Sequence, residues 1–247
     1  MQRITTTLTL LLCFALAAFA QKKDDKKKGL PLDSLRTIPI EVNEGSWIHL
    51  DVSPDGKTIV FELLGDIYTL PMAGGQASRL TKDIAFDSQP RFSPDGKELV
   101  FISDGSGGEN VYVMTLADTT KRQLTEGNNN VFQSPEWTPD GQYIVVSKGA
   151  ILRGVPKLQL LHKDGGSGME LIKEPEQFKT VEAAFGPDGR YIWFSHRSRN
   201  WQYNAVFPQY QLAVYDRETG KYETKTSRYG SAFRPTLSPD GKYLVYG

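Results

Sequence analysis

The sequence has one cysteine and three histidines, and this scarcity excludes several kinds of site. Cys13 lies in the apolar N-terminal segment, so no other cysteine is available for a disulfide framework. His49, His162 and His196 are far apart, and none forms the His-x-His pair typical of zinc hydrolases. We expect each to make an ordinary hydrogen bond in a turn or at a rim. The sequence therefore predicts no catalytic residue and no metal ligand in this chain.

An excess of charge of one sign is also missing, since 29 basic residues balance 29 acidic ones. Without a basic stripe, nucleic acid is excluded as a partner. A Gly-x-Ser-x-Gly nucleophile motif between strand and helix is absent as well. The glycine-rich stretches at 105–108 and 165–168 precede strand-like segments, so we expect them to be turns.

Long hydrophobic runs are limited to residues 8–18, which are too few to span a membrane. Arg3 precedes this run and Ala18-Phe19-Ala20 follows it, which is typical of a secretory signal peptide over residues 1–20 that is cleaved after Ala20. Residues 21–43 include the charge block 22–28 and are predicted to be a flexible linker, with attraction to an anionic membrane surface as the alternative. We therefore expect a periplasmic or extracellular protein without a stable membrane span.

A Pro-Asp-Gly turn recurs five times, at intervals of 40, 45, 48 and 52 residues. The copies are Pro54–Gly56, Pro94–Gly96, Pro139–Gly141, Pro187–Gly189 and Pro239–Gly241. Proline presets φ for such a turn, the aspartate bonds to local backbone, and glycine accepts the positive φ. A Ser or Thr precedes the proline in four copies and can add a hydroxyl bond, which Gly186 removes in the fourth. Recurrence at this spacing indicates a repeat architecture.

Strand-like segments flank each turn and are rich in β-branched and aromatic residues. A third such segment follows in four repeats, at 66–70, 110–114, 157–161 and 211–215, and a short fourth one, such as 78–81 or 122–125, completes the unit. Four antiparallel strands in about 40 to 50 residues are one blade of a β-propeller. The sequence predicts an all-β propeller over residues 44–247, with four whole blades and the first hairpin of a fifth.

The repeat text, Ser-Pro-Asp-Gly-Lys followed by Asn-Val-Tyr-Val-Met and Arg-Gln-Leu-Thr, resembles the repeats of TolB-like propellers. Three segments, at 44–47, 63–68 and 160–168, are similar to the N-terminal propeller of exported bacterial amidohydrolase-family proteins. That resemblance covers residues 44–247. It implies a metal-dependent hydrolase domain beyond Gly247, with zinc or another divalent metal as its cofactor, and it makes this chain a fragment that lacks that domain.

The resemblance implies that this region is a non-catalytic propeller that gates or shields the active site of the C-terminal hydrolase domain. Its partner would then be that domain. An alternative is a TolB-like module that binds envelope proteins, and a further one is the propeller cap of a prolyl-oligopeptidase-type protease. A His-x-His motif downstream favours the first, and a Gly-x-Ser-x-Gly motif favours the last.

Two groups of residues are candidates for binding. Polar residues where the innermost strands begin are expected to line the channel rim: Asp87, Gln89, Gln133 and Arg234. Packing between blades by the neighbouring aromatic residues is the competing interpretation. The insertion in the fourth repeat carries the types of residue found at interface anchors: Arg197, Arg199, Trp201 and Tyr203. An ordered lid that packs on its own blade or on the hydrolase domain is the alternative there.

Overall fold

The computed structural model describes residues 30, 36, 38–46, 48–152, 154–197, 209–227 and 229–247. All regular secondary structure in these residues is β-strand, and the strands form five separate antiparallel sheets. The signal peptide predicted for residues 1–20 lies outside this part of the chain, as does most of the predicted linker. No helix in the described part is long and apolar enough to cross a bilayer.

Four sheets have four strands, and the fifth has two. Blade 1 contains β1 (Leu50–Val52), β2 (Thr58–Leu63), β3 (Asp66–Pro71) and β4 (Ser78–Arg79). Blade 2 contains β5 (Asp87–Phe92), β6 (Glu98–Ser103), β7 (Asn110–Thr115) and β8 (Lys121–Gln123). Blade 3 contains β9 (Asn130–Trp137), β10 (Tyr143–Ala150), β11 (Lys157–His162) and β12 (Met169–Glu170). Blade 4 contains β13 (Lys179–Phe185), β14 (Tyr191–Arg197), β15 (Gln211–Asp216) and β16 (Lys221–Thr224), and module 5 contains β17 (Thr236–Leu237) and β18 (Leu244–Val245).

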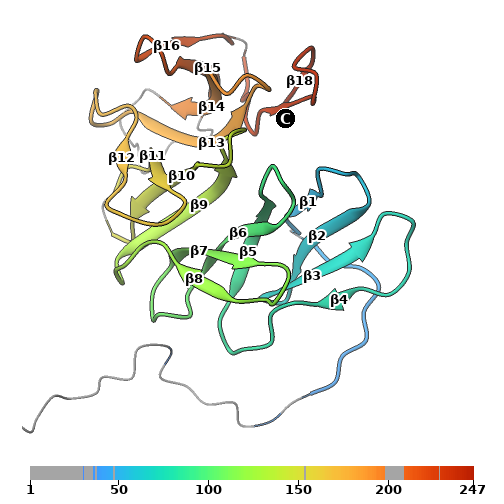
Figure 1. Cartoon of the computed structure of the whole chain (residues 1–247). Helices are drawn as coiled ribbons and strands as arrows, with labels where there is room; N and C mark the ends of the chain where they lie inside the picture. Colours follow the sequence, from blue (N-terminus) through green and yellow to red (C-terminus); the bar gives the residue numbers. More distant parts are fainter. Residues whose placement is uncertain are drawn as a thin grey trace, which may run out of the picture.

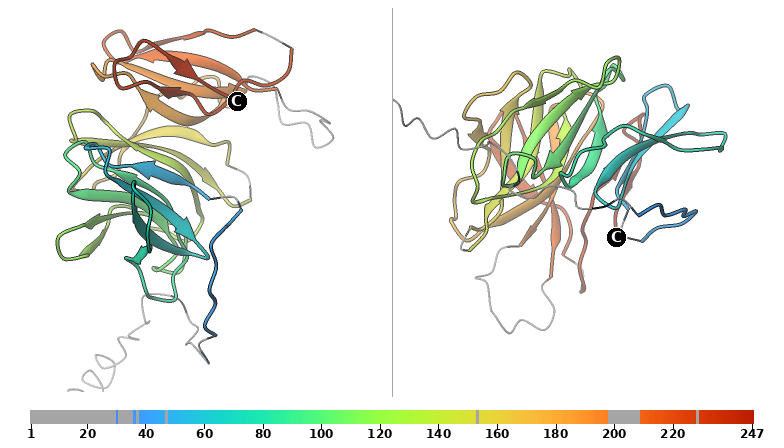
Figure 2. Two further views of the ribbon diagram at one scale, coloured as in Figure 1. Left: turned by 90° about the vertical axis from the view of Figure 1, so that its right-hand side faces the viewer. Right: turned by 90° about the horizontal axis from the view of Figure 1, so that it is seen from below.

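The sheets succeed one another around a common centre, with the first strand of each sheet innermost (Figure 1). Within each sheet every strand pairs with its neighbour in sequence, so the connections are hairpins. The two further views show neighbouring sheets stacked face to face (Figure 2). The prediction of four blades and one additional hairpin is therefore confirmed.

The Pro-Asp-Gly turns make the same side-chain bonds in four modules. In blade 1 the Ser53 hydroxyl donates to Asp55 Oδ1 at 2.6 Å and accepts the Thr58 amide at 2.9 Å, while Asp55 Oδ1 also accepts the Lys57 amide at 3.1 Å. The serine bond, followed by the backbone bond, holds the pKa of Asp55 below its usual value. In blade 4, where Gly186 replaces the hydroxyl residue, the amide bond to Asp188 remains, at 3.1 Å. The predicted role of the hydroxyl is thus present wherever a hydroxyl exists.

From blade 2 onward, each turn packs on the turn of the preceding module. A Cβ placed on the turn glycine would lie 3.4 Å from Pro54 at Gly96 and 2.9 Å from Pro187 at Gly241, whereas at Gly56 it would meet nothing within 4 Å. These glycines have φ near +70°, a conformation that costs other L-residues about 1–2 kcal/mol. The glycine therefore serves both the turn and its stacking on the previous proline.

We expect Gly241→Ala to destabilise the protein more than Gly56→Ala. Both substitutions carry the same cost of a positive φ, and the alanine at 241 must also displace Pro187. The additional loss should be about 1 kcal/mol in the free energy of unfolding, measured by urea unfolding of the two variants. Equal losses would show that the stacked turns contribute no packing energy.

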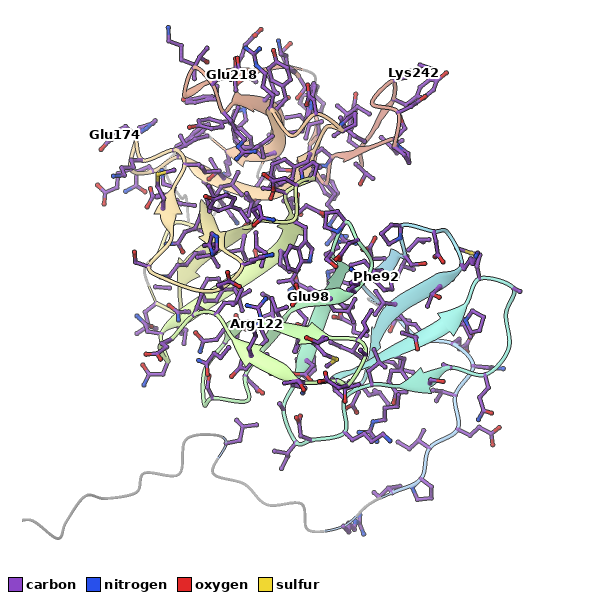
Figure 3. All side chains as sticks on the ribbon, in the orientation of Figure 1. Phe92, Glu98, Arg122, Glu174, Glu218 and Lys242 are labelled. Atoms are coloured by element: carbon purple, nitrogen blue, oxygen red, sulfur yellow. The ribbon has the colours of Figure 1, made fainter. Side chains whose placement is uncertain are left out.

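The hydrophobic core lies between the blades, where the facing surfaces of neighbouring sheets bury apolar side chains. One cluster joins Val60 and Ile67 of blade 1 to blade 2 residues that include Phe92, which is labelled in Figure 3. A second cluster joins blade 2 to blade 3, and a third joins blade 3 to blade 4. Because each sheet packs against the next, the innermost strands are held around an axis, which positions the candidate site.

Candidate functional site

The innermost strands of all five modules border one axial cleft with a volume of about 600 Å³. Residues of β1, β5, β9, β13 and β17 form its wall, together with the prolines of the five turns. Proline, Phe92 and Trp137 make part of this wall apolar, while charged side chains from several blades also reach it. A concave site that mixes apolar walls with a few polar groups is typical of a binding site.

A bulge in each complete innermost strand from blade 2 onward directs polar side chains to the axis. The pairing of β5, β9 and β13 with their neighbours is interrupted near the same position, five residues before the turn proline. The residues there have a left-handed backbone: Gln89, Ser134, Glu182 and, before β17, Arg234, with φ of 55°, 52°, 58° and 53°. A bulge re-aims a side chain, and left-handed non-glycine residues cluster at functional sites. The same backbone strain in four successive modules marks this position.

Each left-handed residue donates its amide proton to a side chain of the preceding blade. The Gln89 amide donates to the Glu62 carboxylate, and the Ser134 amide donates to Gln89 Oε1 at 2.6 Å. In the same way, the Glu182 amide donates to Ser147 Oγ at 3.2 Å.

In module 5 the Arg234 amide lies 3.0 Å from both Glu182 Oε2 and Ser195 Oγ. These bonds satisfy amides that the bulges remove from the strand ladder. The polar residues at this position therefore bind neighbouring blades together, and three of them, Ser134, Glu182 and Arg234, also line the cleft.

An arginine between two carboxylates spans three blades, at the position three residues before the turn proline. Arg91 Nη1 lies 3.8 Å from Asp51 Oδ1, and Arg91 Nε lies 3.6 Å from Glu136 Oε2. Arg91 Nη1 also donates to the Leu50 carbonyl oxygen at 2.7 Å. Burial raises the pKa of Glu136 to about 7, with Arg91 opposing the shift and Asp51 adding to it. The cleft therefore holds a carboxyl group that binds its proton more tightly than an ordinary glutamate does.

The three histidines make local contacts. His49 Nδ1 lies 2.7 Å from Glu62 Oε1, His162 Nδ1 accepts the Asp164 amide at 3.2 Å, and buried His196 contacts the Thr224 hydroxyl at 3.0 Å. Burial lowers the pKa of His196. In the described ranges no group of three His, Cys, Asp or Glu side chains is arranged to hold a metal ion. These residues do not fit the zinc site implied for the hydrolase domain.

Comparison with known proteins shows the family to which the four complete blades belong. The family model of the Tricorn protease N-terminal β-propeller domain matches residues 49–223. The chain belongs to this propeller family. The match begins just before β1 and ends in β16, so it covers the four complete blades.

TolB proteins and the tricorn protease are also similar to this chain, in sequence or in fold. The Tol-Pal system protein TolB of Francisella tularensis subsp. holarctica is 28% identical over 218 residues, which cover 86% of this chain and 46% of TolB. The structure of a putative TolB from Agrobacterium tumefaciens has a TM-score of 0.65 at 22% identity, covering 80% of this chain and 68% of that one. The tricorn protease structure has a TM-score of 0.57 at 14% identity, covering 83% of this chain and 20% of that one. The chain thus spans about half the length of the curated TolB relatives, and this region is a TolB-like propeller.

The four residues predicted at the rim occupy different environments in this propeller. Arg234 lines the axial cleft, whereas Gln89 supports it from behind through the bond to Ser134. Gln133 is exposed on β9 but does not line the cleft. Asp87 is fully buried and pairs with Lys121 Nζ at 2.8 Å, so its position differs from the expected rim. Burial raises the pKa of Asp87, and its Oδ1 accepts no hydrogen bond within the described part of blade 2.

The insertion in blade 4 is described only at its start. Arg197 ends β14, is partly buried and pairs with Lys179 across the strand ladder, away from the axial cleft. Arg199, Trp201 and Tyr203 lie outside the described residues. A binding role for this insertion stays a prediction.

Sequence reasoning did not select five residues that border the cleft: His49, Asp51, Arg91, Glu136 and Glu182. Their common offset from the turn proline was available in the sequence, since they stand three or five residues before it. Aligning the repeats on the proline and reading the variable polar positions column by column would have found them. The competing interpretation, packing by aromatic residues, holds for Phe132, which is buried between blades 2 and 3, but Phe86 is more than half exposed.

Proposed function

We propose that this propeller is the partner-binding domain of an exported protein and that a polypeptide partner binds at the axial cleft. The observation that carries the proposal is the cleft, to which all five modules contribute and which three left-handed residues line, Ser134, Glu182 and Arg234. Similarity to the Tol-Pal system protein TolB supports a role in protein interaction within the cell envelope. The apolar leader at residues 8–18 supports export to the periplasm or beyond.

The resemblance to exported amidohydrolase-family proteins supports a narrower proposal. The propeller would then shield or gate a metal-dependent hydrolase domain encoded after residue 247, and that domain would be the polypeptide at the cleft. The described residues themselves provide neither a nucleophile motif nor a metal-ligand cluster. In this proposal their role is to bind and to restrict access, and zinc, where present, would act in the other domain.

Photocrosslinking tests the location of the partner site. A photoreactive phenylalanine derivative at Ser134 in the cleft should capture a discrete polypeptide in envelope extracts, whereas one at Lys221 on the exposed strand β16 should not. Capture of the same polypeptide from Lys221 alone, or no capture from Ser134, would argue against the axial cleft.

Two further observations separate the partners. The coding sequence downstream of residue 247 should contain a His-x-His motif if the hydrolase proposal holds, and a stop codon soon afterwards favours the envelope module. Amide hydrolysis by the 247-residue chain with added zinc should equal the rate without protein. Turnover that depends on this chain would contradict a purely binding role.

A further inference from the structure

Glu136 has the fewest partners among the carboxylates that line the axial cleft. Within the described residues its carboxylate makes no side-chain hydrogen bond, and its nearest cation, Arg91, also faces Asp51. Glu182, by comparison, accepts the Ser195 hydroxyl at 2.7 Å and the Arg234 amide at 3.0 Å. Glu136 therefore shares one positive charge with a second acid, and apart from the backbone at Trp137 it has no hydrogen-bond partner to replace water.

The charges around Glu136 leave an excess of negative charge in the cleft. Asp51 from β1 and Glu182 from β13 add two carboxylates, and the guanidinium groups are those of Arg91 and Arg234. Arg234 is already engaged by Glu182 at 3.4 Å. His49, which precedes β1, is paired with Glu62 of β2, so this pair does not add a free cation.

The apolar part of the wall strengthens this imbalance. Trp137 is adjacent to Glu136 on β9 and 3% exposed, and prolines of successive turns line the same cleft. Interactions between charges are stronger where low-dielectric side chains displace water. The raised pKa of Glu136 is consistent with poor hydration of its ionised form.

We propose that Glu136 is the specificity-determining residue of the cleft and selects partners that insert a lysine or arginine side chain beside its carboxylate. This inference rests on the proposed binding function and adds the chemistry of the partner. The inserted cation gives Glu136 a partner of its own and leaves Arg91 to Asp51. Because a nearby cation favours the ionised carboxylate, binding near neutral pH is coupled to release of a proton from Glu136.

Blocked tripeptides test this inference. Acetyl-Gly-Arg-Gly-amide and acetyl-Gly-citrulline-Gly-amide have side chains of nearly the same shape, and only the arginine is charged. At pH 8 we expect the arginine peptide to bind the chain about tenfold more tightly in an NMR titration, which corresponds to about 1.4 kcal/mol. The advantage should shrink at pH 6, where Glu136 is mostly protonated.

Two variants make the result specific to Glu136. Glu136→Gln should abolish the preference for arginine at both pH values. Glu98→Gln should retain it, because Glu98 pairs with Arg122 at 3.2 Å in blade 2, outside the cleft (Figure 3). Isothermal titration in buffers of different ionisation enthalpy should show proton release with the arginine peptide alone.

The outcomes separate this inference from the function on which it rests. Equal binding of both peptides overturns the role of Glu136 and leaves peptide binding at the cleft intact. A preference for arginine that survives Glu136→Gln also overturns it. If neither peptide binds at millimolar concentration, both the inference and the axial site for polypeptides are rejected.

Discussion

Phe101→Ala should cost about 3–5 kcal/mol of the free energy of unfolding, the usual range for a fully buried phenylalanine. Phe101 is 0% exposed between blades 1 and 2, where it packs with Val60, Leu99 and Met114. Its ring also stacks on Tyr112, with the ring centroids 5.8 Å apart. The cavity left by the substitution would lie in the contact that holds two blades together. Since whole domains are stable by only about 5–15 kcal/mol, such a loss is severe.

Phe61 provides the matched control for this substitution. It occupies the same repeat position in blade 1 and stacks on Tyr68 in the same way, with the centroids 5.6 Å apart. Phe61 is only partly buried, because no described sheet packs on that face of blade 1. We expect Phe61→Ala to cost about 1–2 kcal/mol. Urea unfolding of both variants measures the difference, and equal losses would mean that packing between blades does not dominate stability.

The architecture was predictable because its signals are local. The Pro-Asp-Gly turn determines its own φ values, and its aspartate bonds to an amide two residues away, as at Asp55 and Lys57. The third strands also matched, since β3 and β7 each extend one residue beyond the expected range. The fourth strands are shorter than expected, because β4 pairs with β3 at only two positions. Edge strands receive bonds from one side, so sequence defines their ends poorly.

The cleft was only partly predictable because it depends on pairing between distant residues. In a regular strand, Asp87 would be expected at the rim of the channel. The bulge at Gln89 changes which side chains of β5 face the axis. A shift of one residue moves a side chain to the other face of the sheet. The buried Asp87 is then neutralised by Lys121, which is 34 residues away and on the last strand of the blade. Neither the bulge nor this partner has a local signature.

The charged group Asp51–Arg91–Glu136 is a second feature that the sequence alone could not predict. Its members come from three blades and are 40 and 45 residues apart in sequence, which is the repeat interval. Only the stacking of blades around an axis brings equivalent positions close together. Aligning the repeats identifies equivalent positions. Only the structure shows that their side chains lie close enough to form a site.

Glu136→Gln should change the pH dependence of stability. Burial raises the folded-state pKa of Glu136 to about 7 from an ordinary value of 4.5, so the folded protein holds this proton more tightly than the unfolded chain. The resulting stabilisation is fully present below about pH 4.5 and is lost as the pH rises through 7. The glutamine side chain is neutral at every pH and escapes this loss. The variant should therefore gain stability relative to the wild type between pH 5 and pH 8.

The gain should be on the order of 1 kcal/mol, because the side chain is 32% exposed and solvent reduces the cost of its charge. Loss of the attraction to Arg91 opposes the gain, but burial is the larger cause of the shift. Urea unfolding at several pH values measures the difference between variant and wild type. Asp87 and His196, whose pKa values are also displaced by burial, are present in both proteins and cancel in that difference.

Glu98→Gln controls for the loss of a carboxylate from an ion pair outside the cleft. If it changes the pH profile as much as Glu136→Gln does, the effect comes from net charge and not from the cleft. If neither variant differs from the wild type in its pH profile, Glu136 is as well hydrated in the folded protein as in the unfolded chain. If Glu136→Gln alone changes the pH profile, Glu136 holds a proton in the folded protein that a partner's cation can displace. The pH dependence of stability and that of binding then come from the same carboxylate.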